Sequence, residues 1–151
     1  RSRQGSHALD RLKIYFAGSI RGGREDRKKY FELIEFLSTH AEVLTEHVGS
    51  ESLGDNGEKN LSDEAIYQRD LEWLSSADAV VAEVTTPSLG VGYEIGIAEK
   101  LGKPVLCLFH DDQSDLRLSA MLSGNSNVET FHYHVLGQAK QKISDFLDDL
   151  S

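Results

Sequence analysis

Residues 79–90, AVVAEVTTPSLG, decide the fold class. The first six, 79–84, form a nearly continuous apolar run, which is typical of a strand that helices cover on both faces. Residues 85–90 predict a turn, and residues 91–101 predict a helix that stops at Gly102. A buried strand, a short turn and a helix together form the repeating unit of an α/β sheet.

The same alternation continues along the chain in both directions. Apolar runs and helical spacing of apolar residues mark the further elements, and glycines with polar residues mark a loop at 48–60. Strands are predicted at 12–18, 42–46, 104–109 and 128–133, and helices at 25–40, 61–77, 116–122 and 138–150.

This order predicts one α/β domain with a doubly wound, five-stranded parallel sheet. The expected architecture is a flavodoxin-like or Rossmann-like three-layer sandwich with right-handed crossovers. Ligands bind such sheets at the carboxyl ends of the strands, so functional residues are expected there. Residues 1–8 show no apolar period and are expected to be a cloning scar or a disordered tail outside the domain, 9–151.

The chain has 151 residues, with 16 Lys and Arg against 25 Asp and Glu, and a formal net charge of −9 at pH 7. That charge argues against nucleic-acid polymers and anionic membranes as partners, because both require a basic face. A single cysteine excludes an internal disulfide. No apolar run reaches the roughly 18–20 residues of a membrane span. We expect an acidic, soluble, intracellular domain that can bind a phosphate only through a local feature.

Two glycine-containing turns provide such a feature. Residues 18–24, GSIRGGR, precede one predicted helix, and residues 87–94, PSLGVGYE, open another, with Ser88 as a fitting N-cap. Glycines let backbone N–H groups approach an anion, and a helix N-terminus adds positive potential. Arg21 and Arg24 could add a charged fork. An ordinary flexible turn remains open for the first segment, but two such turns together favour a phosphate-bearing ligand.

Two carboxylates lie on the apolar faces of predicted helices. Glu94 precedes Ile97 by three residues, and Asp70 lies between Ile66 and Leu74 at helical spacing. A carboxylate at such a position is costly unless it is paired or functional. The structural alternatives are a glutamate satisfied by the helix start and an aspartate paired with an arginine across the sheet. The functional reading is glycosidic-bond chemistry with one nucleophile and one acid.

Other candidates carry weaker signals. Tyr15, near the end of the first strand, could reach the same crevice, although a tyrosine at the sheet rim is the simpler interpretation. His47 follows the second strand and is more often structural at such a place. His132 and His134 share a strand face but lack a third ligand, so no metal site is predicted. Three residues are expected to pack inertly: Trp73, Cys107 and Met121.

Several motifs, in their order along the chain, resemble one known family. They are IYFAGSIRGGREDR, VLTEHV, DLEWL, ADAVVAEVTTPSLGVGYEIG, LCLF and LSAM, within residues 13–121. They resemble the 2′-deoxynucleoside 5′-phosphate N-hydrolases of the nucleoside 2-deoxyribosyltransferase superfamily. The resemblance implies hydrolysis of a deoxynucleoside 5′-monophosphate to free base and 2-deoxyribose 5-phosphate, without a metal or redox cofactor. It also implies a cytoplasmic or nuclear location.

The resemblance further implies roles for individual residues. Glu94 would be the nucleophile that forms a covalent deoxyribosyl 5-phosphate intermediate. Asp70 would donate a proton or orient the sugar, and Tyr15 would position the nucleophile or sugar. Ser119 and Met121 would complete the site of a neighbouring subunit, which implies a homodimer. The remaining nucleotide-site residues would be Gly18, Ser19, Ile20, Arg21, Gly22, Gly23, Arg24, Ser88 and Gly90, with His47 near the base.

Base preference stays open, because residues 48–63 depart from the family pattern and could border the base pocket. A modified pyrimidine such as 5-hydroxymethyl-dUMP is one substrate that the resemblance suggests. The alternatives are a deoxyribosyltransferase, an N-hydrolase of ribonucleotides such as CMP, and a non-catalytic nucleotide-binding sensor. A P-loop NTPase is not expected, because no Gly-Lys-Ser/Thr follows the first turn.

Overall fold

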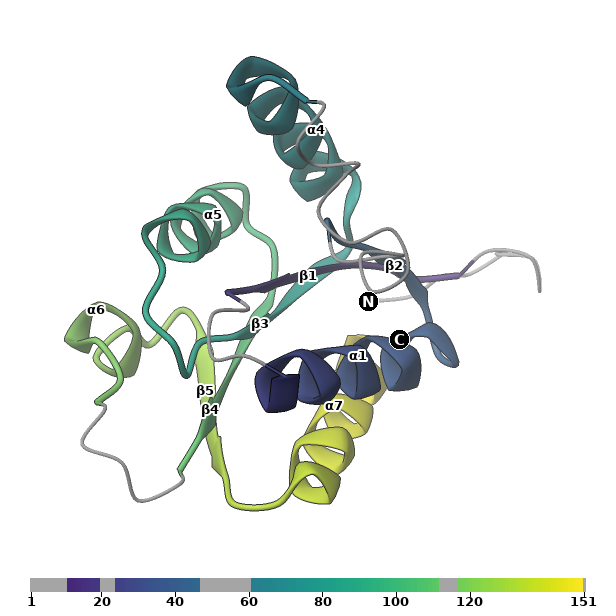
Figure 1. Cartoon of the computed structure of the whole chain (residues 1–151), viewed down its shortest axis with the longest axis vertical. Helices are drawn as coiled ribbons and strands as arrows, with labels where there is room; N and C mark the ends of the chain where they lie inside the picture. Colours follow the sequence, from purple (N-terminus) through teal and green to yellow (C-terminus); the bar gives the residue numbers. More distant parts are fainter. Residues whose placement is uncertain (1–10, 20–23, 47–60, 112–116, 151) are drawn as a thin grey trace.

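The fold is an α/β sandwich built on one parallel sheet. The computed structural model describes residues 11–19, 24–46, 61–111 and 117–150. Its five strands have the order β2-β1-β3-β4-β5, which confirms the predicted flavodoxin-like arrangement (Figure 1). The elements are β1 Lys13–Gly18, α1 Arg24–Ser38, β2 Glu42–Leu44, α4 Asp63–Ser76, β3 Ala79–Glu83, α5 Leu89–Lys100, β4 Val105–His110, α6 Ala120–Ser123, β5 Glu129–Tyr133 and α7 Leu136–Leu150.

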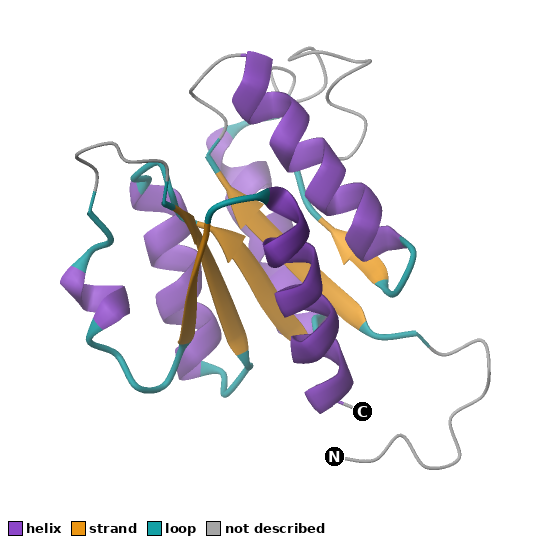
Figure 2. Cartoon of the chain, turned by 90° about the horizontal axis from the view of Figure 1, so that it is seen from below, coloured by secondary structure: helices purple, strands orange, loops and turns teal. Residues whose placement is uncertain are grey.

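Helices cover both faces of the sheet. Helices α1 and α7 lie on one face, and α4, α5 and the short α6 lie on the other, as the two views show together (Figures 1 and 2). Each face has its own apolar core. The first includes Leu33 of α1 and Ile143 of α7, and the second includes Leu74 of α4 and Ile95 of α5, all at most 2 % exposed.

The alternation of side chains along β1 decides what each face receives. Ile14 and Phe16 enter the core under α1 and α7, whereas Tyr15 and Ala17 enter the core under α4 and α5. The pairing of β1 with β3 aligns Gly18 with the last residue of β3. The two strands therefore end together, and the segments that follow them start from the same edge of the sheet.

Helix starts differ slightly from the predicted boundaries because serine caps fix them. The Ser88 side chain accepts a hydrogen bond from the N–H of Val91, so α5 begins at Leu89 instead of position 91. Ser119 caps α6 in the same way, which limits that helix to Ala120–Ser123 instead of the predicted 116–122. The predicted loop 48–60 and the tail 1–8 lie outside the described residues.

Strand β2 is also shorter than predicted. It pairs with β1 only from Lys13 to Tyr15, so it ends at Leu44. The predicted strand 42–46 therefore includes two residues beyond the ladder. No helix among the described ranges is both long and apolar enough for a membrane crossing.

The close contact between Gly18 and Tyr30 gives a stability test. A Cβ at position 18 would lie 2.6 Å from Cε2 of Tyr30, whose side chain is buried. We expect Gly18→Ala to lower the free energy of unfolding by about 1–3 kcal/mol, measured by urea denaturation. The control is Gly96→Ala, in the middle of α5, where a Cβ would meet nothing within 4 Å. The free energy of unfolding of that variant should rise by about 0.5–1 kcal/mol. Equal effects of the two substitutions would contradict the packing argument.

Candidate active site

Tyr15 and Glu94 meet on the face of the sheet that α4 and α5 cover. The Tyr15 hydroxyl donates a hydrogen bond to Oε2 of Glu94 at 2.8 Å. Tyr15 is 2 % exposed and Glu94 is partly buried, so this bond lies largely out of water. Glu94 is one helical turn beyond Gly90, in the N-terminal half of α5. The structure thus places the Tyr15 hydroxyl against Glu94, as the family resemblance implied, and not at the rim of the sheet.

Asp70 belongs to the same cluster, but its arginine partner is a neighbour in sequence. Arg69 contacts Oδ1 of Asp70 with both Nε and Nη2, each at 3.0 Å, and its Nη2 lies 3.4 Å from Oε1 of Glu46. The structural alternative of an aspartate paired with an arginine is therefore present, but the arginine comes from the same helix and not from across the sheet. Consecutive helix residues rarely face each other, but the long Arg69 side chain stacks 4.6 Å from the ring of Trp73 and so turns back towards Asp70.

The surroundings of Glu94 favour its protonated form. Burial raises the pKa of Glu94 to about 7. The hydrogen bond from Tyr15 works in the opposite direction, whereas the charges of Asp70 and Glu46, and a hydrogen bond with Asp70, raise this pKa further. Burial and then the charge of Glu94 raise the pKa of Tyr15 above its usual value, so the hydroxyl keeps its proton as a donor. At neutral pH Glu94 is therefore divided between its acid and its anion.

The start of α5 lies next to this cluster. The first N–H groups of a helix have no partner within the helix, and they favour an anion. Ser88 Oγ already accepts from Val91 N at 3.2 Å, which orders this helix start. Gly90 is exposed, and a Cβ there would approach only Ser88 Oγ, at 3.9 Å. The phosphate site predicted at Ser88 and Gly90 therefore has an ordered helix start and open space beside it.

The remaining predicted residues are distributed over several places. Gly18 and Ser19 are buried at the end of β1, and Arg24 begins α1. Met121 is 80 % exposed on α6, so the interpretation of this residue as a packing residue is wrong. The apolar residues around it suggested a longer, buried helix, but α6 has only four residues. Five predicted positions lie outside the described residues: Ile20, Arg21, Gly22, Gly23 and His47.

The other polar candidates have ordinary surroundings. Cys107 is buried, and burial raises the pKa of its thiol to about 12, which keeps it unreactive. The His132 ring lies 5.2 Å from that of Phe109, and His134 Nδ1 lies 3.3 Å from the carbonyl oxygen of Asp111. Within the described part of the chain, no group of three or more His, Cys, Asp or Glu residues could hold a metal ion.

Sequence reasoning missed Glu83, the last residue of β3. It was counted within an apolar run, yet its side chain is 0 % exposed and faces the core under α1 and α7. The signal was present, because a single glutamate inside AVVAEV is a charge that must find partners when both sheet faces are covered. Arg69 and Glu46 were missed as well, although Arg69 directly precedes a residue that had been singled out.

The raised pKa of Glu94 predicts a pH-dependent stability. The folded protein holds this proton up to about pH 7, whereas the unfolded chain releases it near its ordinary value of 4.5. Stability therefore falls as the pH rises through that window. Glu94→Gln removes this pH dependence. As the pH rises from 5 to 8, the free energy of unfolding of the variant, measured by urea denaturation, should increase by roughly 1–3 kcal/mol relative to that of the parent.

A second glutamate of α5 supplies the control for that measurement. Hydrogen bonds from Asn127 and Asn125 lower the pKa of Glu99, so its ionised form stabilises the folded state. Glu99→Gln should therefore show no gain at pH 8. A gain at pH 8 in both variants, or in neither, would contradict the assignment of the shift to the surroundings of Glu94.

Comparison with known proteins adds independent information. The family model for nucleoside 2-deoxyribosyltransferases matches residues 14–135. A 5-hydroxymethyl-dUMP N-hydrolase of Tetraodon nigroviridis is 48% identical over 141 residues, which cover 91% of this chain and 99% of that protein. The human protein of the same name is 52% identical over 122 residues, covering 80% of this chain and 70% of the other.

Solved structures share the fold at much lower identity. The CMP N-glycosidase BcmB of Clostridium botulinum has a TM-score of 0.65 and 22% identity, covering 87% of this chain and 98% of that one. A 2-deoxyribosyltransferase of Bacillus psychrosaccharolyticus has a TM-score of 0.62 and 19% identity, covering 85% and 90%. The residues that the family model matches include the sheet except Lys13 and the Tyr15–Glu94–Asp70 cluster, and the chain belongs to the nucleoside 2-deoxyribosyltransferase family.

Proposed function

We propose that this protein hydrolyses the N-glycosidic bond of 2′-deoxynucleoside 5′-monophosphates to free base and 2-deoxyribose 5-phosphate. The observation that carries the proposal is the cluster of Tyr15, Glu94 and Asp70 beside the start of α5. The cluster offers a carboxylate for a sugar carbon, and the helix start offers N–H groups for a phosphate. Relatives named 5-hydroxymethyl-dUMP N-hydrolase support this substrate class and make that nucleotide the first to test.

Glu94 would act as the nucleophile. One of its carboxylate oxygens attacks C1′ of the sugar, and the C1′–N bond breaks with its electron pair passing to the base, which takes up a proton. Water then attacks C1′ of the resulting ester, releases 2-deoxyribose 5-phosphate and returns the Glu94 carboxylate. Positive charge develops at C1′ in both steps, and the nearby carboxylate stabilises it. A pKa of about 7 leaves an ionised fraction for this attack at neutral pH.

The neighbours of Glu94 would orient the reaction. The Tyr15 hydroxyl holds one carboxylate oxygen, which leaves the other to face C1′. The contact with Arg69 fixes Asp70, which would orient the sugar and Glu94 as a carboxylate or, in its protonated form, give its proton to the leaving base. A phosphate on Ser88 and Gly90 is remote from the bond that breaks, so its binding energy serves to position the sugar.

A substrate panel tests the proposal. We expect free base and 2-deoxyribose 5-phosphate from deoxynucleoside monophosphates, measured by chromatography. Unphosphorylated deoxynucleosides should react with at least about tenfold lower kcat/KM, because they lose charge-assisted hydrogen bonds. Equal rates would contradict the phosphate site. CMP in the panel tests ribonucleotide hydrolysis, and exchange of the sugar onto an added base would identify a transferase instead.

Replacing the nucleophile separates chemistry from binding. Glu94→Gln should lower base release by at least about a thousandfold, since no carboxylate remains to form the ester. Calorimetry should still detect binding of a deoxynucleoside monophosphate. Glu99→Gln, nearly three turns of helix away from the phosphate end of α5, should keep its rate. Full activity of Glu94→Gln would refute the assignment, and binding without any turnover by the parent protein would identify a nucleotide sensor.

We also propose a homodimer in which Ser119 and Met121 of one subunit complete the site of the other. Large apolar side chains are exposed on the elements around the site, which is typical of an interaction surface. Leu89 is 97 % and Tyr93 is 60 % exposed on α5, Met121 is 80 % exposed on α6, and Tyr67 of α4, 47 % exposed, forms a hydrogen bond with Tyr93.

Mixed dimers test the shared site. Glu94→Gln and Ser119→Ala subunits each carry one defect, and a heterodimer of the two would contain one site with neither. We expect the mixture to exceed the mean activity of the two separate variants after subunits exchange. Each variant alone, taken through the same subunit-exchange procedure, is the control. Activity that stays at the mean would contradict a site shared between subunits.

A further inference from the structure

A buried carboxylate lies on the opposite face of the sheet from the candidate active site. Glu83 ends β3, and its side chain is 0 % exposed. Burial of an ionisable group is costly unless hydrogen bonds and charges satisfy it. The contacts that meet this requirement come from several elements, and the reaction proposed above uses none of them.

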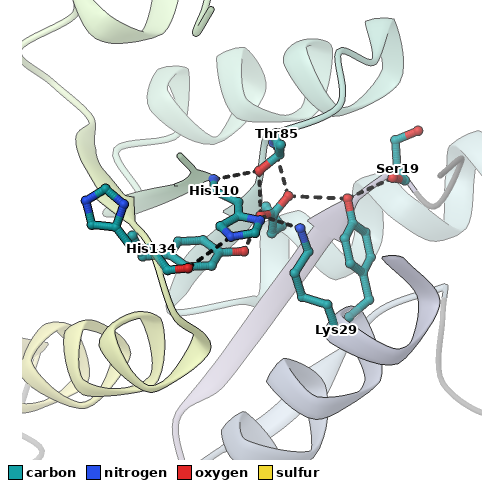
Figure 3. A network of polar contacts seen from close by, with 8 residues as sticks. Ser19, Lys29, Thr85, His110 and His134 are labelled. Carbon is teal, nitrogen blue, oxygen red and sulfur yellow. Dashed lines mark hydrogen bonds and ion pairs between the residues drawn. The ribbon is translucent and has the colours of Figure 1, made fainter. Parts of the chain in front are cut away.

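Two contacts of Glu83 organise the ends of β3 and β4. Oε1 accepts from the backbone N–H of Thr85 at 3.0 Å, and Oε2 accepts from the Thr85 hydroxyl at 2.7 Å. The same Thr85 oxygen accepts from the backbone N–H of His110 at 2.7 Å. Figure 3 shows Thr85 between these groups. The carboxylate therefore fixes the first residues of the segment that leads from β3 to the start of α5.

Two further contacts come from tyrosines that are equally buried, each 1 % exposed. Tyr133, at the end of β5, donates to Oε2 of Glu83 at 2.6 Å. Tyr30 of α1 faces Oε1 at 3.4 Å, and its hydroxyl donates at 2.7 Å to the carbonyl oxygen of Ser19. Only one of these two tyrosines therefore connects the network to Ser19, the residue that follows β1 (Figure 3).

A cation completes the network. Lys29 Nζ lies 3.5 Å from Oε2 of Glu83, and its side chain is 15 % exposed. The same ammonium lies 5.9 Å from the ring centre of Tyr30 and 6.0 Å from that of Tyr133. Both distances are within the range of a cation–π contact. Lys29 thus holds the two rings beside the carboxylate as well as neutralising its charge.

We propose that Tyr30, held in place by Glu83, is a positioning residue that fixes Ser19 for nucleotide binding. Ser19 is 8 % exposed, and the bond to its carbonyl oxygen fixes the backbone directly after β1. The ring of Tyr30 also occupies the space beside Gly18, so the last residue of β1 and the one after it are held by one side chain. The inference rests on the proposed function, because it takes Ser19 as part of the nucleotide site.

The test compares two matched tyrosine variants. Tyr30→Phe and Tyr133→Phe each remove one hydroxyl next to Glu83, but only the first removes the bond to Ser19. We expect Tyr30→Phe to raise KM for a deoxynucleoside monophosphate about three- to tenfold, the effect of one lost hydrogen bond. Its kcat should stay within about twofold. Tyr133→Phe should keep both constants within about twofold, although it loses a hydroxyl from the same carboxylate.

Binding without turnover provides a second measurement. We would add each tyrosine substitution to Glu94→Gln and measure binding of 2′-deoxyuridine 5′-monophosphate by calorimetry. Tyr30→Phe should raise Kd by the same factor as it raises KM, whereas Tyr133→Phe should leave Kd unchanged. Equal changes in the two tyrosine variants, or none in Tyr30→Phe, would overturn the inference while hydrolysis by the parent protein still supports the proposed function. A parent protein that neither hydrolyses nor binds these nucleotides would overturn both.

Glu83→Gln tests whether Tyr30 depends on the carboxylate. The substitution keeps the shape of the side chain but removes the charge that holds Lys29, so we expect Kd to rise as in Tyr30→Phe. The double variant should then have a Kd no more than about twofold above that of Glu83→Gln alone, because that substitution already weakens the bond that Tyr30→Phe removes. Additive losses would overturn the dependence of Tyr30 on Glu83. If Glu83→Gln does not fold, the two tyrosine variants decide the role of Tyr30 by themselves.

Discussion

The parallel pairing of β1 with β3 is the constraint on which both polar clusters depend. It ends the two strands at the same edge and aligns Gly18 with Glu83. Because side chains alternate along a strand, Tyr15 reaches Glu94 on one face, whereas Glu83 reaches Tyr30 on the other. A shift of one residue in β1 would turn Tyr15 away from Glu94, and a shift of one residue in β3 would turn Glu83 away from Tyr30.

The sequence pattern was sufficient to predict the sheet, but not the partners of the buried charges, and the place of Tyr15 beside Glu94 was implied only by the family resemblance. Strands covered on both faces are continuous apolar runs, so their order could be read from local patterns. The partners of Glu83 come from Tyr30 and Tyr133, which lie 53 and 50 residues away in sequence. No periodicity encodes a contact over that distance. Arg69 was missed for the opposite reason, since a neighbour in sequence rarely pairs with the residue beside it in a helix.

The carboxylates that contribute to the net charge of −9 differ in how their surroundings neutralise them. The charges of Asp70 and Glu46 raise the pKa of Glu94, and Arg69 offsets part of those charges. Glu83 is offset by Lys29 and by hydroxyl donors. The negative charge of the cluster around Glu94 is thus only partly neutralised, whereas the buried Glu83 carboxylate has a cation and several hydrogen-bond donors. This difference is what one expects between a reactive carboxylate and one that holds structure.

Gly18 and Tyr30 illustrate how such an arrangement restricts the evolution of the chain. The ring of Tyr30 occupies the volume that a side chain at position 18 would need, and its hydroxyl holds Ser19. A smaller residue at position 30 would make room for alanine at position 18 but would lose the bond to Ser19. A side chain at position 18 therefore requires a smaller residue at position 30. A phenylalanine at position 30 would keep the packing and lose the bond, so it is a single-step route by which a descendant could keep the fold while weakening nucleotide binding.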